Sequence, residues 1–136
     1  MSTKVGFVGV GVMGKLMAIN LLKRHYPVTA FDLNPAPVEE LLEFGAERAG
    51  SGAEAAAAGD VVITMLPSSP HVEAAVLGPG GILDGMRPGT VLIDMSTIDP
   101  LVSKRVAAQV TAGRGLRDCA SDRGCRTARA LRPWTW

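Results

Sequence analysis

The chain has 136 residues, of which 47% are apolar and 4% aromatic, and its formal net charge at pH 7 is +1. This length suits one domain with a core of aliphatic side chains. No segment approaches the roughly 18 uninterrupted apolar residues of a membrane helix, and the N-terminus lacks the pattern of a secretory signal, so we expect a cytoplasmic protein that binds no membrane.

The first 45 residues predict two strand–helix units. The run Lys4–Val10 is rich in valine and bounded by glycine, which is typical of a buried strand. Residues 12–25 carry apolar side chains at helical spacing and end in basic residues, as a helix does. A second strand, Pro27–Asp32, precedes a helix over 34–45, where Asn34 is the expected N-cap.

The rest of the chain continues the alternation. Ser51 and Glu54 form a capping-box sequence at the start of a helix over 51–59. The later elements are a strand at Asp60–Pro67, a short helix over 69–78, a turn-rich connection over 79–89, a strand at Thr90–Ser96, and a helix from near Pro100 to 113 with Asp99 or Thr97 as its cap. Such alternation predicts an α/β fold, a doubly wound parallel sheet with crossover helices on both faces.

A glycine motif carries the main chemical signal. Gly9, Gly11 and Gly14 follow a predicted strand and open a predicted helix, and the turn also contains Val12 and Met13. Together with an acidic residue at the end of the next strand, this spacing is the dinucleotide-binding fingerprint. The glycines permit a tight turn, close approach of a pyrophosphate and close helix packing, and the helix N-terminus attracts the phosphates. A glycine-rich turn that binds nothing is the competing interpretation.

The acidic residue of the fingerprint is Asp32, 18 positions after Gly14. Its carboxylate can accept hydrogen bonds from both hydroxyls of the adenosine ribose, and it would repel a 2′-phosphate. No arginine follows it to bind such a phosphate. We therefore expect NAD as the cofactor in preference to NADP.

Two later strand ends fit the same site, because ligands of open α/β sheets lie beyond the carboxyl ends of the strands. Leu66 and Pro67 are candidates to flank the adenosine or ribose, and Thr97 is a candidate to reach the nicotinamide side. Strand termination by Pro67 and helix capping by Thr97 are the alternatives.

Four segments together resemble the β-hydroxyacid dehydrogenases, which include 3-hydroxyisobutyrate dehydrogenase, tartronate semialdehyde reductase and, more distantly, 6-phosphogluconate dehydrogenase. The segments are "GFVGVGVMGKLMAINLLK", "FDLNP", "ITMLPSSPHVEAAVLGPGGI" and "LIDMSTIDPLVSKRVAAQV". The resemblance covers about residues 4–113 and implies a Rossmann-type domain. It implies that the cofactor is contacted by the Gly9–Gly14 loop, Asp32, Leu66, Pro67, the position of His71, and Thr97. For His71 we prefer an exposed side chain in the first turn of a helix.

The family pattern stops near Asp118. Family members continue with a motif of the form Asp-Ala-Pro-Val-Ser-Gly-Gly, a catalytic lysine and a helical C-terminal domain, and Cys119 to Trp136 match none of these. The resemblance therefore predicts a dinucleotide-binding domain over 1–118 and a non-family tail over 119–136, with the helical domain absent. It implies no catalytic residue within these 136 residues, so we expect them to be inactive alone.

Composition also changes at this point. Residues 1–113 hold 8 basic and 11 acidic residues, a net charge of −3, whereas residues 114–136 hold six arginines and two aspartates, a net charge of +4. Removing one pyrimidine between codons 118 and 119 permits Asp-Ala-Pro-Val-Thr-Gly-Gly-Val, nearly the missing motif. We interpret the tail as an out-of-frame translation and expect it to be poorly ordered.

Other interpretations of the tail are weaker. Cys119 and Cys125 have no third or fourth ligand nearby for zinc, and a disulfide is disfavoured in the cytoplasm. The arginines and tryptophans could bind nucleic acid, but nothing arranges them on one face, so we expect no nucleic-acid partner and no metal.

The sequence thus predicts the truncated NAD(P)-binding domain of an oxidoreductase for a short β-hydroxyacid, of the 3-hydroxyisobutyrate or 2-hydroxy-3-oxopropionate type, with nicotinamide dinucleotide as its partner. An NADPH-dependent imine reductase-like fragment, a non-catalytic nucleotide-binding module and a non-functional gene product are the alternatives. The oligomeric state is left open.

Overall fold

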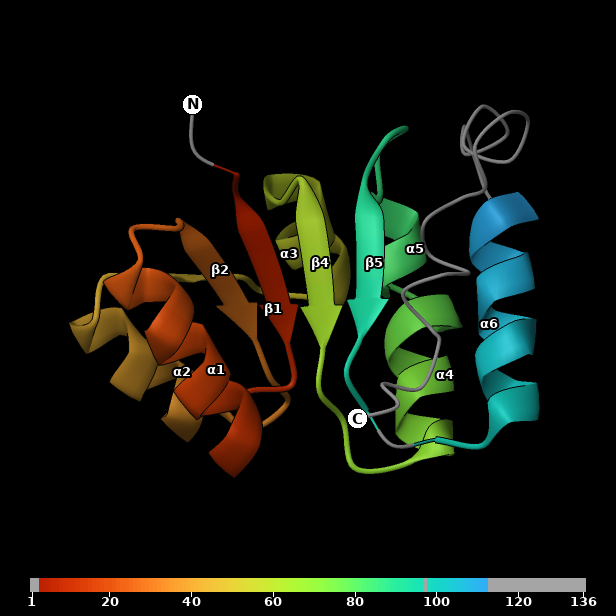
Figure 1. Cartoon of the computed structure of the whole chain (residues 1–136), viewed down its shortest axis with the longest axis horizontal. Coiled ribbons are helices and arrows are strands. Elements are labelled where there is room, and N and C mark those ends of the chain that lie inside the picture. Colours follow the sequence, from red (N-terminus) through yellow and green to blue (C-terminus); the bar gives the residue numbers. More distant parts are fainter. Residues whose placement is uncertain (1–2, 97, 113–136) are drawn as a thin grey trace.

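A parallel five-stranded sheet forms the centre of the molecule (Figure 1). The computed structural model describes residues 3–96 and 98–112. The strands stand in the order β3-β2-β1-β4-β5. The chain therefore adds β2 and β3 on one side of β1, and then adds β4 and β5 on its other side. Their bounds are β1 Val5–Val8, β2 Val28–Phe31, β3 Glu47–Arg48, β4 Val61–Thr64 and β5 Val91–Asp94. The predicted doubly wound α/β fold is confirmed.

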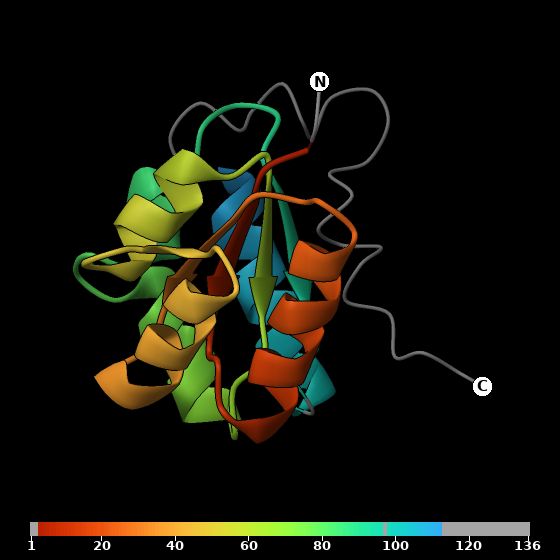
Figure 2. The ribbon, with the colours of Figure 1, turned by 90° about the vertical axis from the view of Figure 1, so that its left-hand side faces the viewer.

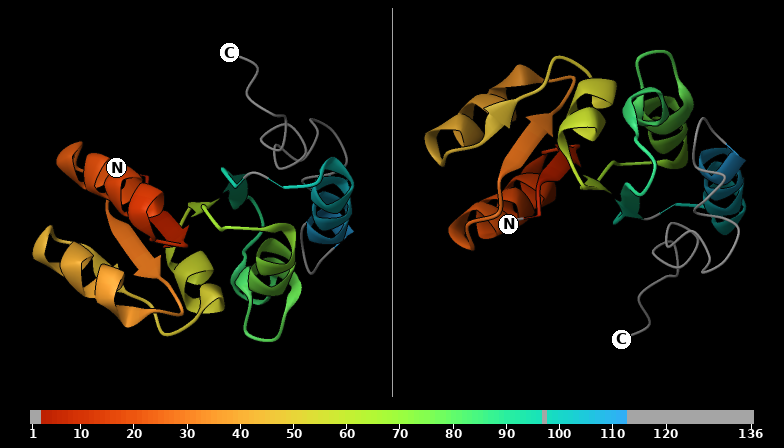
Figure 3. Two further views of the ribbon diagram at one scale, coloured as in Figure 1. Left: turned by 90° about the horizontal axis from the view of Figure 1, so that it is seen from below. Right: turned by 90° about the horizontal axis from the view of Figure 1, so that it is seen from above.

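Helices cover both faces of this sheet. Their bounds are α1 Val12–Lys23, α2 Pro35–Glu43, α3 Gly52–Ala58, α4 Ser69–Leu77, α5 Ile82–Gly85 and α6 Pro100–Ala112. Figure 2 shows α1 on one side of the sheet and α3 and α5 on the other. The views along the strands in Figure 3 place α6 at the far end of the molecule from α1 and α2.

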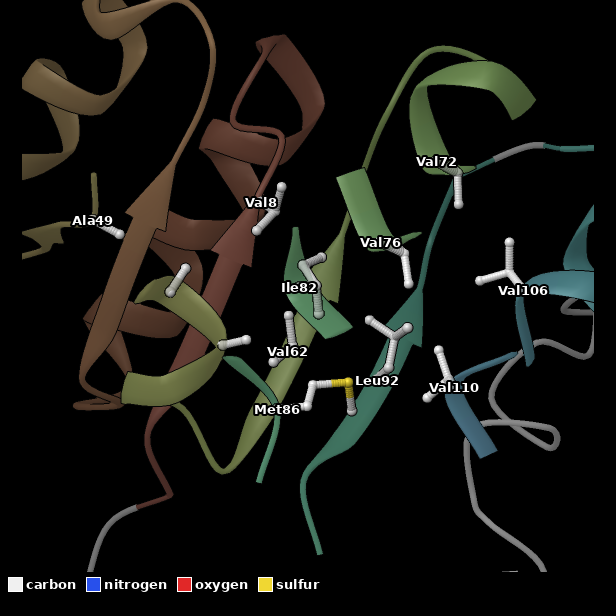
Figure 4. Close-up of a cluster of buried hydrophobic side chains, with 12 residues drawn as sticks. Val8, Ala49, Val62, Val72, Val76, Ile82, Met86, Leu92, Val106 and Val110 are labelled. Carbon is white, nitrogen blue, oxygen red and sulfur yellow. The ribbon is translucent and has the colours of Figure 1, made fainter. Parts of the chain in front are cut away.

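Each face of the sheet has its own hydrophobic core, because successive strand residues point to opposite sides. Phe7 of β1 belongs to the core beneath α1 and α2, whereas its neighbour Val8 belongs to the core beneath the other helices (Figure 4). In that second core, Leu92 of β5 packs in one cluster with Val106 and Val110 of α6. Burial of these side chains therefore holds α6 to the domain.

Two elements differ from the sequence-based expectation. The strand β3 was not predicted, because Glu47 and Arg48 are both exposed and show no apolar alternation. Among the described strands they pair with β2 alone. The short helix α5 lies within the segment predicted as a turn-rich connection. Its first residue, Ile82, is fully buried, and this burial stabilises a single turn that the surrounding glycines obscure.

The predicted helix caps are found at three starts. Asn34 Oδ1 accepts from the Ala36 amide at 3.2 Å, and Ser51 Oγ accepts from the Glu54 amide at 3.1 Å. The Glu54 carboxylate accepts from the Gly50 amide, whereas a capping box would use the amide of Ser51, one residue later. At α6, Asp99 Oδ1 accepts from the Leu101 amide at 2.8 Å, so of the two candidates Asp99 is seen to cap that helix.

Several sequence-based expectations concern residues that the structure does not describe. Thr97 lies outside the described residues, as does the tail with Cys119 and Cys125. Within 3–96 and 98–112, no helix is both long and apolar enough to cross a membrane. The same residues contain no group of three or more His, Cys, Asp or Glu side chains that could hold a metal ion.

Candidate dinucleotide site

The candidate residues gather at one edge of the sheet. All pairings between strands are parallel, so the carboxyl ends of β1, β2, β4 and β5 lie together (Figure 1). The glycine turn follows β1, Asp32 follows β2, and Leu66 and Pro67 follow β4. The fold therefore brings together segments that are more than 50 residues apart in the sequence.

The glycine turn begins with a backbone conformation that needs glycine. Gly9 has φ of +91°, which lies in the region that L side chains rarely adopt. A Cβ atom there would collide with the Met65 carbonyl oxygen and would lie 2.8 Å from Leu66 Cδ2. The Gly9 amide donates to the Phe31 carbonyl at 3.1 Å. The turn is thus held between the end of β2 and the loop that follows β4.

Gly14 allows the first helix to approach this turn. A Cβ atom at Gly14 would overlap the Gly9 carbonyl oxygen and would lie 3.3 Å from Phe7 Cε1. The close packing predicted for this position is therefore present, and its nearest partner is the backbone of the turn itself.

Gly11 faces open space. An added Cβ would meet no atom of the described residues within 4 Å, and none of their side chains caps the N-terminus of α1. Val12 and Met13 in the first turn are 79% and 58% exposed. The first-turn amides and the positive end of the helix dipole are thus available to an anion, as the fingerprint requires.

Asp32 supports the loops on both sides of it. Its Oδ2 accepts from the Val10 amide at 2.8 Å, and its Oδ1 accepts from the Asn34 amide at 2.9 Å. Among the described residues it has no ion-pair partner, and the adjacent Leu33 is 88% exposed. Each carboxylate oxygen keeps a free lone pair, so Asp32 can still accept from a ribose hydroxyl.

The loops after β4 and β5 are joined by polar contacts that the sequence did not reveal. Leu66 donates its amide to Ser96 Oγ at 2.7 Å. Asp94 accepts from the Thr64 hydroxyl and from the Ser96 amide, both at 2.9 Å. The only local signal would have been polar residues at the ends of apolar strands, which does not distinguish a structural contact from a ligand contact.

His71 lies in the first turn of α4 with an exposed side chain, as preferred from the sequence. Its Nδ1 lies 2.6 Å from Ser68 Oγ, so its described polar contact is local. Pro67 is exposed at the end of the β4 loop, and Leu66 is half-buried against the core beneath α3–α6. The structure therefore places Leu66 beside the glycine turn, and Pro67 follows it in the loop after β4.

Comparison with known proteins gives an independent result. A family model described as the NAD binding domain of 6-phosphogluconate dehydrogenase matches residues 4–117. The 2-(hydroxymethyl)glutarate dehydrogenase of Eubacterium barkeri is 44% identical over 115 residues, which cover 85% of this chain and 38% of that protein. The 3-hydroxyisobutyrate dehydrogenase of Pseudomonas aeruginosa is 42% identical over 129 residues, covering 94% of this chain and 43% of that protein, so this match extends past residue 118.

Solved structures agree in fold. The 3-hydroxyisobutyrate dehydrogenase of Mycobacterium tuberculosis superimposes with a TM-score of 0.76 and 35% identity, covering 82% of this chain and 38% of that one. A complex of Psf3 with NADP+ gives a TM-score of 0.75 at 28% identity, and the imine reductase of Streptomyces aurantiacus gives 0.71 at 27%. These two structures cover 82% and 80% of this chain and 39% and 37% of their own. The chain spans roughly two-fifths of the length of these relatives.

Proposed function

Because the chain belongs to the β-hydroxyacid dehydrogenase family and matches its NAD-binding domain, we propose that it binds NAD(H) in preference to NADP(H) at the carboxyl edge of its sheet. The observation that carries the proposal is the open Gly11 beside the uncapped start of α1, with Asp32 at the end of the adjacent strand. Family membership supports a nicotinamide dinucleotide, and the preference for NAD rests on this chain's own residues.

Each part of the site has a proposed role. The pyrophosphate would lie against Gly11 and the first turn of α1, where exposed Val12 and Met13 leave the backbone amides accessible. Asp32 would accept hydrogen bonds from the adenosine ribose. Leu66 and Pro67 would form the wall opposite α1. The cofactor supplies the hydride chemistry, and these residues bind and orient it.

The preference for NAD follows from charge. A 2′-phosphate on the ribose would stand against the Asp32 carboxylate, and like charges a few ångströms apart repel by about 1 kcal/mol even in water. The next residue, Leu33, is exposed and apolar, so it offers no compensating cation.

The whole enzyme's reaction is also a proposal, because the chain covers only part of its relatives. We propose that the domain serves an oxidoreductase that moves a hydride between nicotinamide and the hydroxyl-bearing carbon of a short β-hydroxyacid. The only lysines are Lys4, Lys15, Lys23 and Lys104, and none occupies the position that the family's catalytic helix would have. We therefore expect no NADH production from 3-hydroxyisobutyrate or glycerate by these 136 residues; activity above that of a Gly11→Asp control would contradict this.

Calorimetric titration of the full chain with NADH tests the binding proposal. Binding is expected, and Gly11→Asp is expected to weaken it at least tenfold, since a carboxylate would occupy the space open to the pyrophosphate. Because a Cβ atom at residue 11 meets no atom of the described residues within 4 Å, the variant should keep the thermal midpoint of the natural chain. Absence of NADH binding by the natural chain would overturn the proposal.

An NADPH-dependent imine reductase-like function is the second candidate, favoured by the similarity in fold to the Streptomyces aurantiacus enzyme. The carboxylate of Asp32 counts against it. NADPH binding at least as tight as NADH binding would favour this candidate. Retained NAD affinity with no turnover in any longer form of the protein would instead indicate a non-catalytic nucleotide-binding module.

A further inference from the structure

The loops after β4 and β5 stay in register beyond the strands themselves. Thr64 and Asp94 are the last paired residues of these strands, and their side chains are hydrogen-bonded. Two positions further on, the Leu66 amide donates to Ser96 Oγ. Both contacts join residues that are 30 positions apart, so side chains continue the parallel pairing where the backbone ladder has ended.

The same spacing recurs at the start of the following helices. The Asp99 amide donates to Ser69 Oγ at 3.1 Å, which again joins residues 30 positions apart. The Arg105 guanidinium of α6 then pairs with the Glu73 carboxylate of α4. The loop after β4 is therefore attached to the loop after β5 along its length.

Asp94 is the centre of this connection. Its Oδ1 accepts from both the Thr64 hydroxyl and the Ser96 amide. Thr64 is fully buried and Asp94 is 9% exposed, so these contacts form where water competes little and hydrogen bonds to a charged group are strong. The carboxylate thereby fixes the backbone of Ser96, and hence the place of its hydroxyl.

The connection reaches the glycine turn through Leu66. Ser96 holds the Leu66 amide at 2.7 Å. The Leu66 side chain lies so close to Gly9 that a Cβ there would be 2.8 Å from Cδ2. A displacement of the Leu66 backbone would therefore move one wall of the space beside the turn.

We propose that Ser96, held by Asp94, is a positioning residue for the dinucleotide: it acts through the Leu66 amide to set the loop after β4 against the glycine turn. This inference rests on the proposed function, because it assigns a consequence for NADH binding. Neither Ser96 nor Asp94 is itself expected to touch the cofactor. Its physical basis is that a binding site must be held within about 0.5 Å of its productive geometry by hydrogen bonds and packing around it.

A matched contact at the other end of β5 provides the control. The Thr90 hydroxyl accepts from the Arg87 amide at 3.3 Å, and Thr90 is 4% exposed. Like Ser96, Thr90 is a hydroxyl residue near β5 that binds a backbone amide, but it lies at the amino edge of the sheet, away from the glycine turn. Removing either hydroxyl should lower the thermal midpoint, but only removal of the Ser96 hydroxyl should weaken NADH binding.

The experiment compares Ser96→Ala, Ser96→Thr and Thr90→Val in the full chain. NADH affinity is measured by calorimetry well below each thermal midpoint, and hydrogen exchange of the Leu66 amide is followed by NMR. We expect Ser96→Ala to weaken NADH binding on the order of tenfold and to speed hydrogen exchange of the Leu66 amide. Ser96→Thr, which keeps a hydroxyl, should restore both, and Thr90→Val should bind NADH as the natural chain does.

The outcomes separate the two proposals. A natural chain that fails to bind NADH overturns the proposed function. A natural chain that binds, together with Ser96→Ala binding within twofold of it or with Thr90→Val weakened equally, overturns the positioning role alone. Should Ser96→Ala fail to fold, Ser96→Cys takes its place. That variant replaces the hydroxyl that accepts from the Leu66 amide by a weakly accepting thiol of similar shape, and unaltered NADH affinity would again overturn the inference.

Discussion

At the scale of single residues, Asp32 holds the backbone around it and is also proposed to bind the cofactor, whereas the sequence predicted only the second role. The fingerprint predicts a ribose acceptor, whereas the structure shows a carboxylate that already accepts from the Val10 and Asn34 amides. These two contacts orient the side chain before any ligand arrives. A preorganised acceptor binds with less loss of conformational entropy than a free one.

Replacing Asp32 with alanine is expected to narrow the difference between NADH and NADPH affinity by about fivefold or more, because repulsion of the 2′-phosphate is removed. NADH itself should bind more weakly, since the ribose and the Val10 amide both lose an acceptor. Calorimetry with each cofactor measures this. Asp60→Ala is the matched control, because Asp60 also accepts from a backbone amide, that of Lys4, at the opposite edge of the sheet. Equal affinity of the natural chain for both cofactors would contradict the role of Asp32.

The glycines of the turn are expected to respond differently to alanine. Gly14→Ala places a Cβ against the Gly9 carbonyl oxygen and should cost about 1–3 kcal/mol of unfolding free energy. The Cβ of Gly11→Ala meets no atom within 4 Å in the part of the chain that the structure describes, and residue 11 has φ of −63°, so the stability of this variant should be nearly unchanged. Urea unfolding of both variants tests the contrast, and equal losses would show that the packing at Gly14 is not the constraint.

At the scale of elements, the helix starts divide by what satisfies them. The described N-caps Asn34 and Ser51 each accept from a backbone amide of their helix. The start of α1, at Gly11, has no such side chain. Unpaired amides at a helix start need water, a side chain or a ligand. The starts of α4 and α5 also lack a side-chain cap, so α1 is set apart by its uncapped start together with the open space at Gly11.

Removing the cap of α3 should therefore affect stability alone. Ser51→Ala is expected to cost about 0.5–2 kcal/mol, seen as a fall of several degrees in the thermal midpoint, with NADH affinity in the folded protein unchanged. Melting curves and calorimetry on the same preparation measure both quantities. A loss of affinity would mean that α3 is coupled to the site, which its contacts with α5 and the sheet do not predict.

At the scale of the whole molecule, the described residues supply two hydrophobic cores and all of the expected cofactor contacts except Thr97. Burial of Val106 and Val110 against β5 includes α6 in the domain. The match to the family model ends at residue 117, whereas the match to the Pseudomonas aeruginosa enzyme covers 129 residues. A truncation after Asp118 therefore tests whether residues 119–136 belong to the domain.

A chain truncated after Asp118 is expected to match the full chain in thermal midpoint and in NADH affinity. The reason is the proposal that residues 119–136 are an out-of-frame translation, which would not be selected to pack on the domain. Burial of one large side chain such as Trp134 is worth about 1.5–3 kcal/mol. A fall of several degrees on truncation would therefore show that the tail is folded structure, and sequencing the gene across codons 118–119 tests the frame itself.

Much of this arrangement can be read from local sequence. Apolar runs of strand length, helical spacing and capping residues are local signals, and they predicted four of the strands and the long helices with their order. The glycine spacing and Asp32 are equally local, because a tight turn, a helix start and the end of the next strand lie within about 25 residues. These signals sufficed for the fold class, the family resemblance and the dinucleotide.

Other features depend on how distant segments meet in space. The pairing of Glu47 and Arg48 with β2 reflects a neighbouring strand rather than their own pattern, and α5 depends on burial of Ile82. The contact of Leu66 with Ser96, and of Leu66 with Gly9, arises because parallel strands place their carboxyl ends side by side in a particular register. Register is a property of the assembled sheet, so the residues proposed to position the site become visible only once β1, β4 and β5 stand together.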